Sequence, residues 1–433
     1  MIGERMKIAI IGTGYVGLCT GTGFASKGHD VVCVDIDEVK VNKVNSGIPP
    51  IYETDLEDML KDVISKNRLR ATTNINSAIK ECEVVFICVG TPSDDVGRID
   101  LKYVRQSALD IGNALRECDY KVVVVKSTVT PETTENIVIP KIEEASGKKV
   151  GQDFGMCMTP EFLREGSALK DVLEPDRTVI GEYDQRSGDT IEPIFKELNA
   201  PILRTKIKVA ELIKYANNAF LATKISYSNE IGNICKRLGV DVYDVLKGVG
   251  MDHRMSPYFF NAGAGWGGSC FPKDVAAIIE KAKELGYEPK MLQEVVDINK
   301  RQKVRMVEQL QKKMDIKNKK IAVLGLSFKA NTDDIRDASS IDIIKKLLDS
   351  GAIVAAYDPQ AMENMKHIFP GITYNENATE TLRDADACLI VTEWEEFKNL
   401  KDENFNIMKN KLILEGRKVL DKKEIKDFDG ICW

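Results

Sequence analysis

The fold of this chain is decided by the stretch Lys7-Ile-Ala-Ile-Ile-Gly12-Thr-Gly14-Tyr-Val-Gly17. Its apolar residues predict a buried strand, and the glycine spacing predicts a tight turn into a helix over Val16 to Lys27. A second strand is predicted from Asp30 to Asp35. Together these elements form a βαβ unit, the usual start of a doubly wound parallel sheet.

The glycine turn has the features of a dinucleotide site. Gly12 permits the turn, Gly14 lets the backbone approach a pyrophosphate, and Gly17 lets helix and strand pack closely. Asp35 lies 18 residues after Gly17, where a carboxylate binds the adenosine ribose and repels a 2'-phosphate, so NAD is favoured over NADP. Lys40 nearby weakens that preference. A plain turn with an exposed aspartate is the alternative interpretation. The expected cofactor residues here are Gly12, Gly14, Tyr15, Val16, Gly17, Asp35 and Lys40.

The chain has 433 residues, too many for one core, and suggests roughly three domains of about 150 residues each. We expect an α/β fold in which two Rossmann-like, doubly wound parallel-sheet domains are joined by a central helical domain. Further strands are predicted over 84–89, 121–126, 156–158, 321–324, 353–357 and 388–391. The expected boundaries are 1–205 for the NAD-binding domain, 206–313 for the helical domain and 314–433 for the second Rossmann-like domain.

The second half of the chain repeats part of the first. Lys320-Ile-Ala-Val-Leu-Gly325 is nearly the same as Lys7 to Gly12. Ser327 stands where the first copy has Gly14, so the close approach to a pyrophosphate is not repeated. Duplication and the common pattern of a buried first strand both explain the similarity. In either case we expect the second sheet to hold something other than the dinucleotide.

Composition excludes several classes of protein. With 43% hydrophobic and 30% charged residues and a net charge of −6, the chain is not basic enough to suggest nucleic acid. We expect no signal peptide and no membrane span, because no apolar run approaches the roughly 20 residues needed. Ten cysteines without CxxC pairs predict reduced thiols in a cytoplasm. Three histidines, none at ligand spacing, argue against a metal site and against a histidine base.

A cysteine lies in the bare loop Gly263-Ala-Gly-Trp-Gly-Gly-Ser-Cys270-Phe-Pro-Lys-Asp274. A helix is predicted from Pro272 to Leu285, which places Cys270 at its amino terminus, where the helix dipole favours thiolate. The glycines have no apolar side chains that could bury the thiol, which favours a reactive thiol over a buried structural cysteine. A thiolate that adds to an aldehyde allows a second hydride to leave, and water then releases the acid. Nicotinamide and thiol together suggest an alcohol oxidised past the aldehyde.

Polar residues follow several predicted strands. Gly90-Thr-Pro92 and Lys126-Ser-Thr128 stand at carboxyl ends, where α/β sheets bind ligands, although each is also an ordinary cap or turn. Glu161 and Glu165 would share one face if they were helical, and a solvated helix start is the alternative.

A predicted helix places Lys214 and Asn218 one turn apart. The pair could donate hydrogen bonds to an oxyanion, or could be a surface lysine and a helix-face asparagine. We expect Asp274 to bind water or orient Lys214, because its charge opposes thiolate formation.

These motifs together resemble the UDP-glucose 6-dehydrogenase branch of the UDP-glucose/GDP-mannose dehydrogenase family, over essentially the whole chain. The resemblance is carried by Gly12 to Gly17 with Asp35, Gly90 to Pro92, Lys126 to Thr128, Pro160 to Glu165, Lys214 to Asn218, Gly267 to Asp274, and Phe328-Lys329 with Arg336. It implies a four-electron, NAD-dependent oxidation of UDP-glucose to UDP-glucuronate through a hemithioacetal and a thioester.

The resemblance also implies residue roles. Cys270 would be the nucleophile, Lys214 and Asn218 the oxyanion donors, Asp274 their partner, Thr128 the holder of a water and Glu161 the base for hydrolysis. Further cofactor contacts would come from Gly90, Thr91, Pro92, Ser127, Thr128, Glu165, Lys273 and Arg336. Substrate contacts would come from Glu161, Phe162, Leu163, Glu165, Lys214, Asn218, Arg254, Asn261, Gly263, Gly265, Gly267, Phe328, Lys329 and Arg417. Residues 314–433 would bind the UDP-sugar.

The resemblance implies a shared site as well, because Arg254 matches an arginine that reaches across a subunit interface. At least a homodimer is therefore expected, with the interface in the helical domain.

Ser269 before Cys270 favours the UDP-glucose branch, since the N-acetylhexosamine branch typically has histidine there. The loop Tyr52-Glu-Thr-Asp-Leu56 departs from the usual Tyr-Glu-Pro-Gly-Leu, and we expect it to be peripheral to the chemistry. The main alternative is the same reaction on UDP-N-acetylmannosamine, UDP-N-acetylglucosamine-type sugars or GDP-mannose. Two others are a two-electron hydroxyacid dehydrogenase with an incidental Cys270, and a silent NAD-sensing module.

Overall fold

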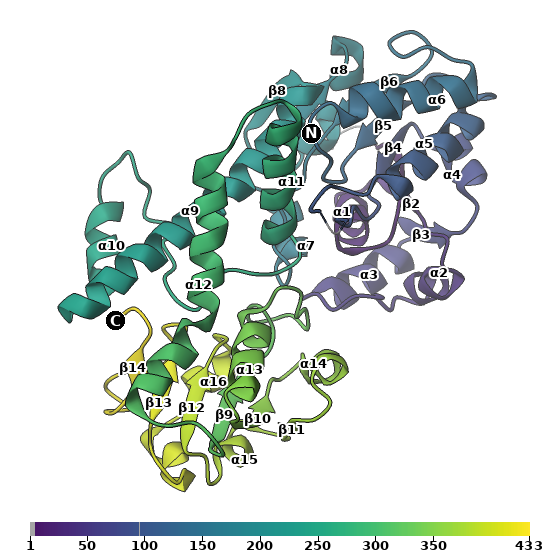
Figure 1. Ribbon diagram of the computed structural model, residues 1–433. Coiled ribbons are helices and arrows are strands. Elements are labelled where there is room, and N and C mark those ends of the chain that lie inside the picture. The colour runs from purple at the N-terminus through teal and green to yellow at the C-terminus, as the bar shows by residue number, and fades with distance from the viewer. Residues whose placement is uncertain (1–4, 95) are drawn as a thin grey trace. The chain divides into compact units, whose positions relative to one another are not determined.

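The structure is a computed structural model that describes residues 5–94 and 96–433 (Figure 1). The chain forms two compact units that divide between Ala216 and Asn217. Each contains one twisted sheet with helices packed on it, so the predicted α/β class with two Rossmann-like sheets and a helical region between them is confirmed. The expected domain boundaries at 205/206 and 313/314 stay a prediction. In the described ranges, no helix is long and apolar enough to cross a membrane.

The first unit is built on an eight-stranded sheet with the order β3-β2-β1-β4-β5-β6-β7-β8. The strands are β1 Lys7–Ile11, β2 Asp30–Val34, β3 Leu69–Thr72, β4 Val84–Ile87, β5 Val122–Val125, β6 Gly155–Met158, β7 Thr178–Glu182 and β8 Ile202–Lys206. All neighbours run parallel except β6 and β7, which are antiparallel. The connection from β6 to β7 carries one short helix, and β7 starts at the edge where β6 ends.

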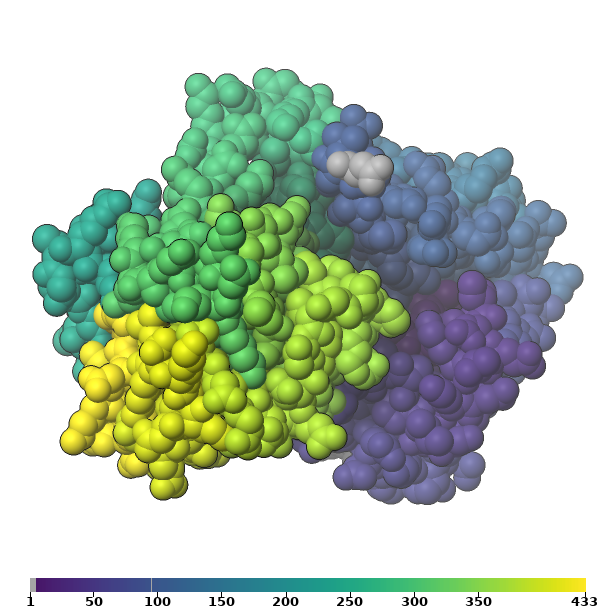
Figure 2. All heavy atoms as spheres, turned by 60° about the horizontal axis from the view of Figure 1, so that its bottom comes forward, coloured from purple at the N-terminus to yellow at the C-terminus, as the bar shows by residue number. Residues whose placement is uncertain are grey.

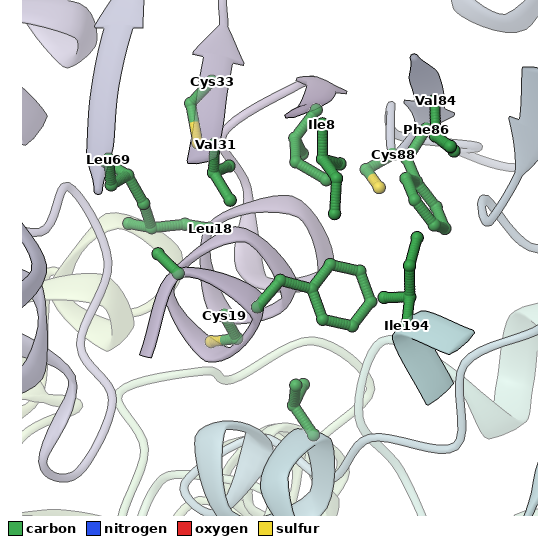
Figure 3. Close-up of a cluster of buried hydrophobic side chains, with 14 of the residues drawn as sticks. Ile8, Leu18, Cys19, Val31, Cys33, Leu69, Val84, Phe86, Cys88 and Ile194 are labelled. Atoms are coloured by element: carbon green, nitrogen blue, oxygen red, sulfur yellow. The ribbon is translucent and has the colours of Figure 1, made fainter. Parts of the chain in front are cut away.

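Helices cover both faces of this sheet. They are α1 Tyr15–Ser26, α2 Glu38–Asn45, α3 Leu56–Ser65, α4 Ile75–Glu81, α5 Lys102–Leu115, the π-helix η1 Thr134–Val138, α6 Ile139–Ser146, α7 Ala168–Leu173 and α8 Gln185–Lys196. Alternate residues of β1 enter different cores, Ile8 and Ile10 on one face and Ala9 and Ile11 on the other. Figure 3 shows the first core, where Leu18 of α1 lies below the sheet among buried side chains. This packing fixes α1, and with it the glycine turn, against β1.

The second unit begins inside α9 Ile207–Leu238, a 32-residue helix. Three more helices follow: α10 Val242–Gly250, α11 Phe271–Glu284 and α12 Lys290–Lys313. Its sheet has the order β11-β10-β9-β12-β13-β14. The strands are β9 Lys320–Leu324, β10 Ile353–Tyr357, β11 Thr373–Tyr374, β12 Ala387–Ile390, β13 Ile413–Glu415 and β14 Asp429–Gly430. The helices around them are α13 Ser339–Asp349, α14 Met362–Ile368, α15 Ala378–Leu382, α16 Glu395–Lys398 and the 3-10 helix η2 Asp402–Ile407.

The carboxyl-terminal end, yellow in Figure 2, is tied to α12 within this unit, because Gln309 Nε2 donates to the carbonyl oxygen of Ile431 at 2.9 Å.

The repeat in the sequence extends to the topology. The order β11-β10-β9-β12-β13 matches β3-β2-β1-β4-β5, and Gly325 has a φ of +95° where Gly12 has +101°. An aspartate follows the second strand in both sheets, but Asp358 is fully buried. Its carboxylate accepts from the backbone N–H of Leu326 at 2.7 Å and from Trp394 Nε1 at 3.0 Å. In the second sheet, this carboxylate is therefore engaged in hydrogen bonds within the protein.

Candidate functional site

The glycine turn after β1 leaves the start of α1 open. A Cβ on Gly17 would lie 1.9 Å from the carbonyl oxygen of Gly12, so close packing requires a glycine there. A Cβ on Gly14 would meet nothing within 4 Å. Gly14 is the N-cap of α1, without a side-chain cap and with no acidic residue in the first turn. Uncapped N–H groups beside open space suit a pyrophosphate, so these residues fit the expected dinucleotide.

Asp35 is half-buried at the end of β2 and is held in its charged form. Its Oδ2 accepts from the Thr13 N–H at 2.9 Å and from Thr13 Oγ1 at 2.5 Å, while Oδ1 accepts from the Asp37 N–H at 3.0 Å. Burial alone would raise the pKa of Asp35, but these donors and the charge of Lys40 hold it below its ordinary value. An ionised carboxylate at this position fits a ribose and disfavours a 2'-phosphate.

The predicted residues after β4 and β5 lie at one edge of the sheet. Ser127 Oγ donates to the carbonyl oxygen of Val89 at 2.7 Å, which ties the two loops together. Thr91 and Thr128 are buried beside this link, whereas Gly90 is exposed. The edge therefore presents hydroxyl groups where α/β sheets bind ligands.

Glu161 and Lys214 form a buried ion pair. Lys214 Nζ lies 2.7 Å from Glu161 Oε1, and the two side chains are 3% and 7% exposed. Glu161 Oε2 also accepts from the Leu163 N–H at 2.6 Å. Burial would raise the pKa of Glu161, but Lys214, this N–H and Lys126 outweigh burial and lower it. Glu161 is therefore a carboxylate, as a base requires.

The segment around Glu161 is a loop. Residues 159–164 are irregular and Glu165 starts a turn, so the helical possibility for Glu161 and Glu165 is wrong. Pro160 lacks an N–H and the Glu161 carboxylate takes the Leu163 N–H, so hydrogen bonding here is local rather than helical. The guanidinium of Arg177 stacks 3.8 Å from the centre of the Phe162 ring and supports this loop.

Asn218 follows Lys214 by one turn on α9 and pairs with Asp274 of α11. Asn218 Nδ2 donates to Asp274 Oδ2 at 2.6 Å, and Lys273 Nζ lies 2.6 Å from Asp274 Oδ1. The Asp274 side chain is 1% exposed. The structure thus brings Asp274 to Asn218, as the resemblance implies, and fixes which way the amide points.

Cys270 is the N-cap of α11, and its side chain makes no capping hydrogen bond. Ser269 Oγ lies 3.5 Å from its Sγ. The ten cysteines are thiols outside any disulfide, and eight of them are buried. Burial raises the pKa of thiols such as Cys33 and Cys88 to about 12. Cys270 is partly exposed at a helix amino terminus, the setting that favours a thiolate.

The glycines of the Cys270 loop are required by close approach of the second sheet's loops. A Cβ on Gly267 would lie 2.0 Å from the carbonyl oxygen of Asp337, and one on Gly268 would lie 2.7 Å from the Phe328 ring. Arg417 Nη2 donates to the carbonyl oxygen of Gly265 at 2.7 Å. The predicted substrate residues Gly263, Gly265, Gly267, Phe328 and Arg417 therefore lie together.

Other predicted residues lie nearer the surface. Arg254 is exposed in the loop after α10 and pairs with Asp252 at 2.6 Å. Arg336 pairs with Asp334 at 2.6 Å. Asn261 is exposed and Lys329 is partly buried. The roles of these side chains stay predictions.

Sequence reasoning assigned no role to two buried residues, Glu53 and Lys126. Glu53 is buried, and its carboxylate accepts from the N–H groups of Gly166 and Ala168, each at 2.8 Å. Glu53 thus anchors the segment that follows Glu161, while the expectation that the loop Tyr52–Leu56 is peripheral to the chemistry stays a prediction. Lys126 is buried beside Glu161, and its place directly after a strand was the available signal. Among the described residues, no cluster of three or more His, Cys, Asp or Glu side chains could hold a metal.

Three domain families match the sequence in order, all of the UDP-glucose/GDP-mannose dehydrogenase family: the NAD binding domain over residues 6–199, the central domain over 208–301 and the UDP binding domain over 322–422.

Individual relatives agree with these matches. A UDP-glucose 6-dehydrogenase of Haloferax volcanii is 47% identical over 432 residues, covering 98% of this chain and 100% of the relative. One of Bacillus subtilis is 43% identical, covering 97% and 90%. A solved UDP-glucose dehydrogenase from Pyrobaculum islandicum superposes with a TM-score of 0.93 at 38% identity, covering 100% and 98%. A UDP-N-acetylmannosamine dehydrogenase from Pyrococcus horikoshii gives 0.86 at 28%, covering 98% and 99%. The chain therefore belongs to the UDP-glucose/GDP-mannose dehydrogenase family.

Proposed function

We propose that this protein is a UDP-glucose 6-dehydrogenase that oxidises UDP-glucose to UDP-glucuronate with NAD. The observation that carries the proposal is its identity of 47% and 43%, over nearly the whole chain, to proteins of that name. The partly exposed Cys270 at the start of α11 supports a reaction that continues past the aldehyde.

Two NAD molecules, bound one after the other, would each accept one hydride in the two successive oxidations. The N–H groups at the start of α1 and the carboxylate of Asp35 suit the pyrophosphate and ribose of NAD. The remaining contacts are assigned to Tyr15, Val16, Lys40, Gly90, Thr91, Pro92, Ser127, Thr128, Glu165, Lys273 and Arg336.

Cys270 supplies the covalent step. Its Sγ forms a bond to carbon 6 of the aldehyde, and the carbonyl π electrons move to oxygen, giving a hemithioacetal oxyanion. Lys214 Nζ and Asn218 Nδ2 donate to that oxygen. Asp274 already accepts from Asn218 and holds its amide in one orientation.

Glu161 acts in the last step, on the thioester. Its carboxylate takes a proton from a water held by Thr128, and the water oxygen attacks the thioester carbon. The carbon–sulfur bond breaks, and its electron pair returns to Cys270 as thiolate. The lowered pKa of Glu161, which Lys214 and the Leu163 N–H maintain against burial, keeps this base ionised near neutral pH.

The UDP-sugar would be bound by Phe328, Lys329 and Arg417 of a domain spanning 314–433, next to the glycines of the Cys270 loop. The full set of proposed substrate contacts adds Glu161, Phe162, Leu163, Glu165, Lys214, Asn218, Arg254, Asn261, Gly263, Gly265 and Gly267. The packing of Gly268 against Phe328 and the hydrogen bond from Arg417 to Gly265 support the proposal that Phe328 and Arg417 lie next to the Cys270 loop.

A homodimer in the cytoplasm, formed through a helical domain spanning 206–313, is part of the proposal. Phe220, Tyr227 and Ile234 repeat every seven residues on α9 and are 63%, 45% and 49% exposed. Residues at this spacing share one helix face, and an exposed apolar stripe of this kind suits a helix–helix interface.

The experiment that tests the function counts the NADH formed per UDP-glucose when the sugar is limiting and NAD is in excess. Two NADH establish the four-electron route and the substrate together. One NADH per UDP-glucose would contradict the proposed role of Cys270. If UDP-glucose gives no NADH but UDP-N-acetylmannosamine or GDP-mannose gives two, the proposed substrate is wrong and the proposed reaction stands.

A further inference from the structure

Two buried lysines flank strand β5. Lys121 precedes the strand, and its Nζ donates to the carbonyl oxygens of Cys82 and Lys80 at 2.5 and 3.3 Å. Lys126 follows the strand and is 7% exposed. Within the two described ranges, burial and the charges of nearby titratable groups act on the Lys126 ammonium, without a hydrogen bond. One lysine is thus satisfied by backbone carbonyls, and the other is not.

The strand register places Lys126 beside the loop of Glu161. β5 pairs in parallel with β6, with Val125 opposite Met158, so Lys126 and Thr159 leave the sheet side by side. Glu161 comes two residues later. On the other side, β4 ends before Cys88, and the Lys126 N–H donates to Ile87 O at 2.9 Å.

The charges around Lys126 do not balance. Glu161 is neutralised by its ion pair with Lys214, and Lys126 places a second buried amine beside the same carboxylate. The titratable groups that act on Lys126 are Cys88 after β4, Glu161 after β6 and Lys214 of α9. Burial lowers the pKa of the Lys126 ammonium below its ordinary value; Cys88 and Glu161 oppose this shift, and Lys214 adds to it. Buried charges without a full partner are retained in proteins mainly where they serve a function.

We infer that Lys126 is a positioning residue that keeps Glu161 ionised while Lys214 is engaged with the substrate oxyanion. Lys214 cannot at the same time hold the oxyanion and fully neutralise Glu161. Without a second cation, the buried carboxylate would take up a proton and could no longer accept one from water. The inference rests on the proposed function, in which Glu161 is the base for thioester hydrolysis.

The test compares Lys126→Met with Lys121→Met, which removes an equally buried lysine at the opposite end of the same strand. Two quantities are measured against pH: kcat for acid formation, and the fraction of acid-quenched enzyme that carries the covalent adduct on Cys270, read from its intact mass. For Lys126→Met, we expect the acidic limb of the kcat–pH profile to move up by about one pH unit. At pH values below this limb, kcat should fall by about tenfold. The adduct should accumulate there, with KM for UDP-glucose little changed.

Lys126→Arg should return the acid limb close to its normal position, because arginine keeps the charge, and Lys121→Met should leave the limb in place. The inference would be overturned if Lys126→Met had the same acidic limb of the kcat–pH profile as the wild type and accumulated no extra adduct. An equal shift in Lys126→Arg would also overturn it. If Lys126→Met does not fold, Lys126→Gln serves in its place. The wild-type enzyme separates the two proposals: a wild type that forms no adduct and releases one NADH refutes the proposed function itself.

Discussion

At the scale of single residues, the proposed role of Cys270 distinguishes this protein from a simple alcohol dehydrogenase. Cys270→Ser should lower acid formation by on the order of 10³-fold or more, because serine is far less nucleophilic at neutral pH. NAD affinity should stay unchanged. Cys118 is the matched control, since it is the other partly exposed cysteine. Acid formation by Cys270→Ser at the level of Cys118→Ser would refute the thiol mechanism; both rates follow from product analysis.

His29 makes a second residue-scale prediction, about stability and pH. It is buried, and its Nδ1 accepts from the Met6 N–H at 3.2 Å. Burial lowers its pKa, although Glu197 and Asp30 partly offset this. The unfolded chain takes up a proton at His29 near its ordinary pKa of about 6.5, whereas the native state resists it. The free energy of unfolding should therefore decrease as pH falls through about 6.5.

Urea unfolding between about pH 7.5 and 5.5 measures this dependence. His29→Gln should flatten part of the slope, while His253→Gln, whose side chain is 93% exposed, should leave it unchanged. Equal slopes in both variants would show that other groups cause the pH dependence.

At the scale of elements, the turn between β1 and α1 separates packing from ligand binding. Gly17→Ala should lower Tm by several degrees, because its Cβ would lie 1.9 Å from the Gly12 oxygen. Gly14→Ala has open space and should keep Tm within about a degree, yet weaken NAD binding by about tenfold or more by crowding the helix start. Calorimetry and NAD titration measure the two effects. A large loss of Tm in Gly14→Ala would contradict this division.

Some elements of the fold could be predicted from the sequence, and others could not. β1, α1, β2 and α11 were predictable because apolar periodicity and a glycine or proline mark their ends. The reversed direction of β7 was not, since it depends on the tertiary pairing of β7 with β6. Glu53 was missed because its partners, Gly166 and Ala168, lie more than a hundred residues away and are backbone N–H groups. Lys214 was predictable as a helix-face residue, but its ion pair with Glu161 requires the folded loop.

At the scale of the whole molecule, the exposed apolar stripe on α9 makes assembly testable. Tyr227→Asp with Ile234→Asp places two charges on a stripe whose members are 45% and 49% exposed, and should convert a dimer into monomers. Light scattering after size exclusion gives the mass of each species. Lys236 and Arg237 lie at the end of the same helix, so Arg237→Ala serves as a control with an unchanged apolar stripe. A dimer that survives both aspartates would show that the interface lies elsewhere.

If the site is shared between chains, two inactive variants should restore each other. Arg254→Ala and Cys270→Ala are each expected to be inactive alone. Mixed under conditions of subunit exchange, half of the dimers are mixed, and each mixed dimer has one site that combines Cys270 of one chain with Arg254 of the other. Activity should therefore recover to about a quarter of the wild-type value. If Arg254 serves its own chain, both sites of every mixed dimer are defective and no activity returns. The rate of NADH formation after mixing thus decides whether Arg254 acts across the interface.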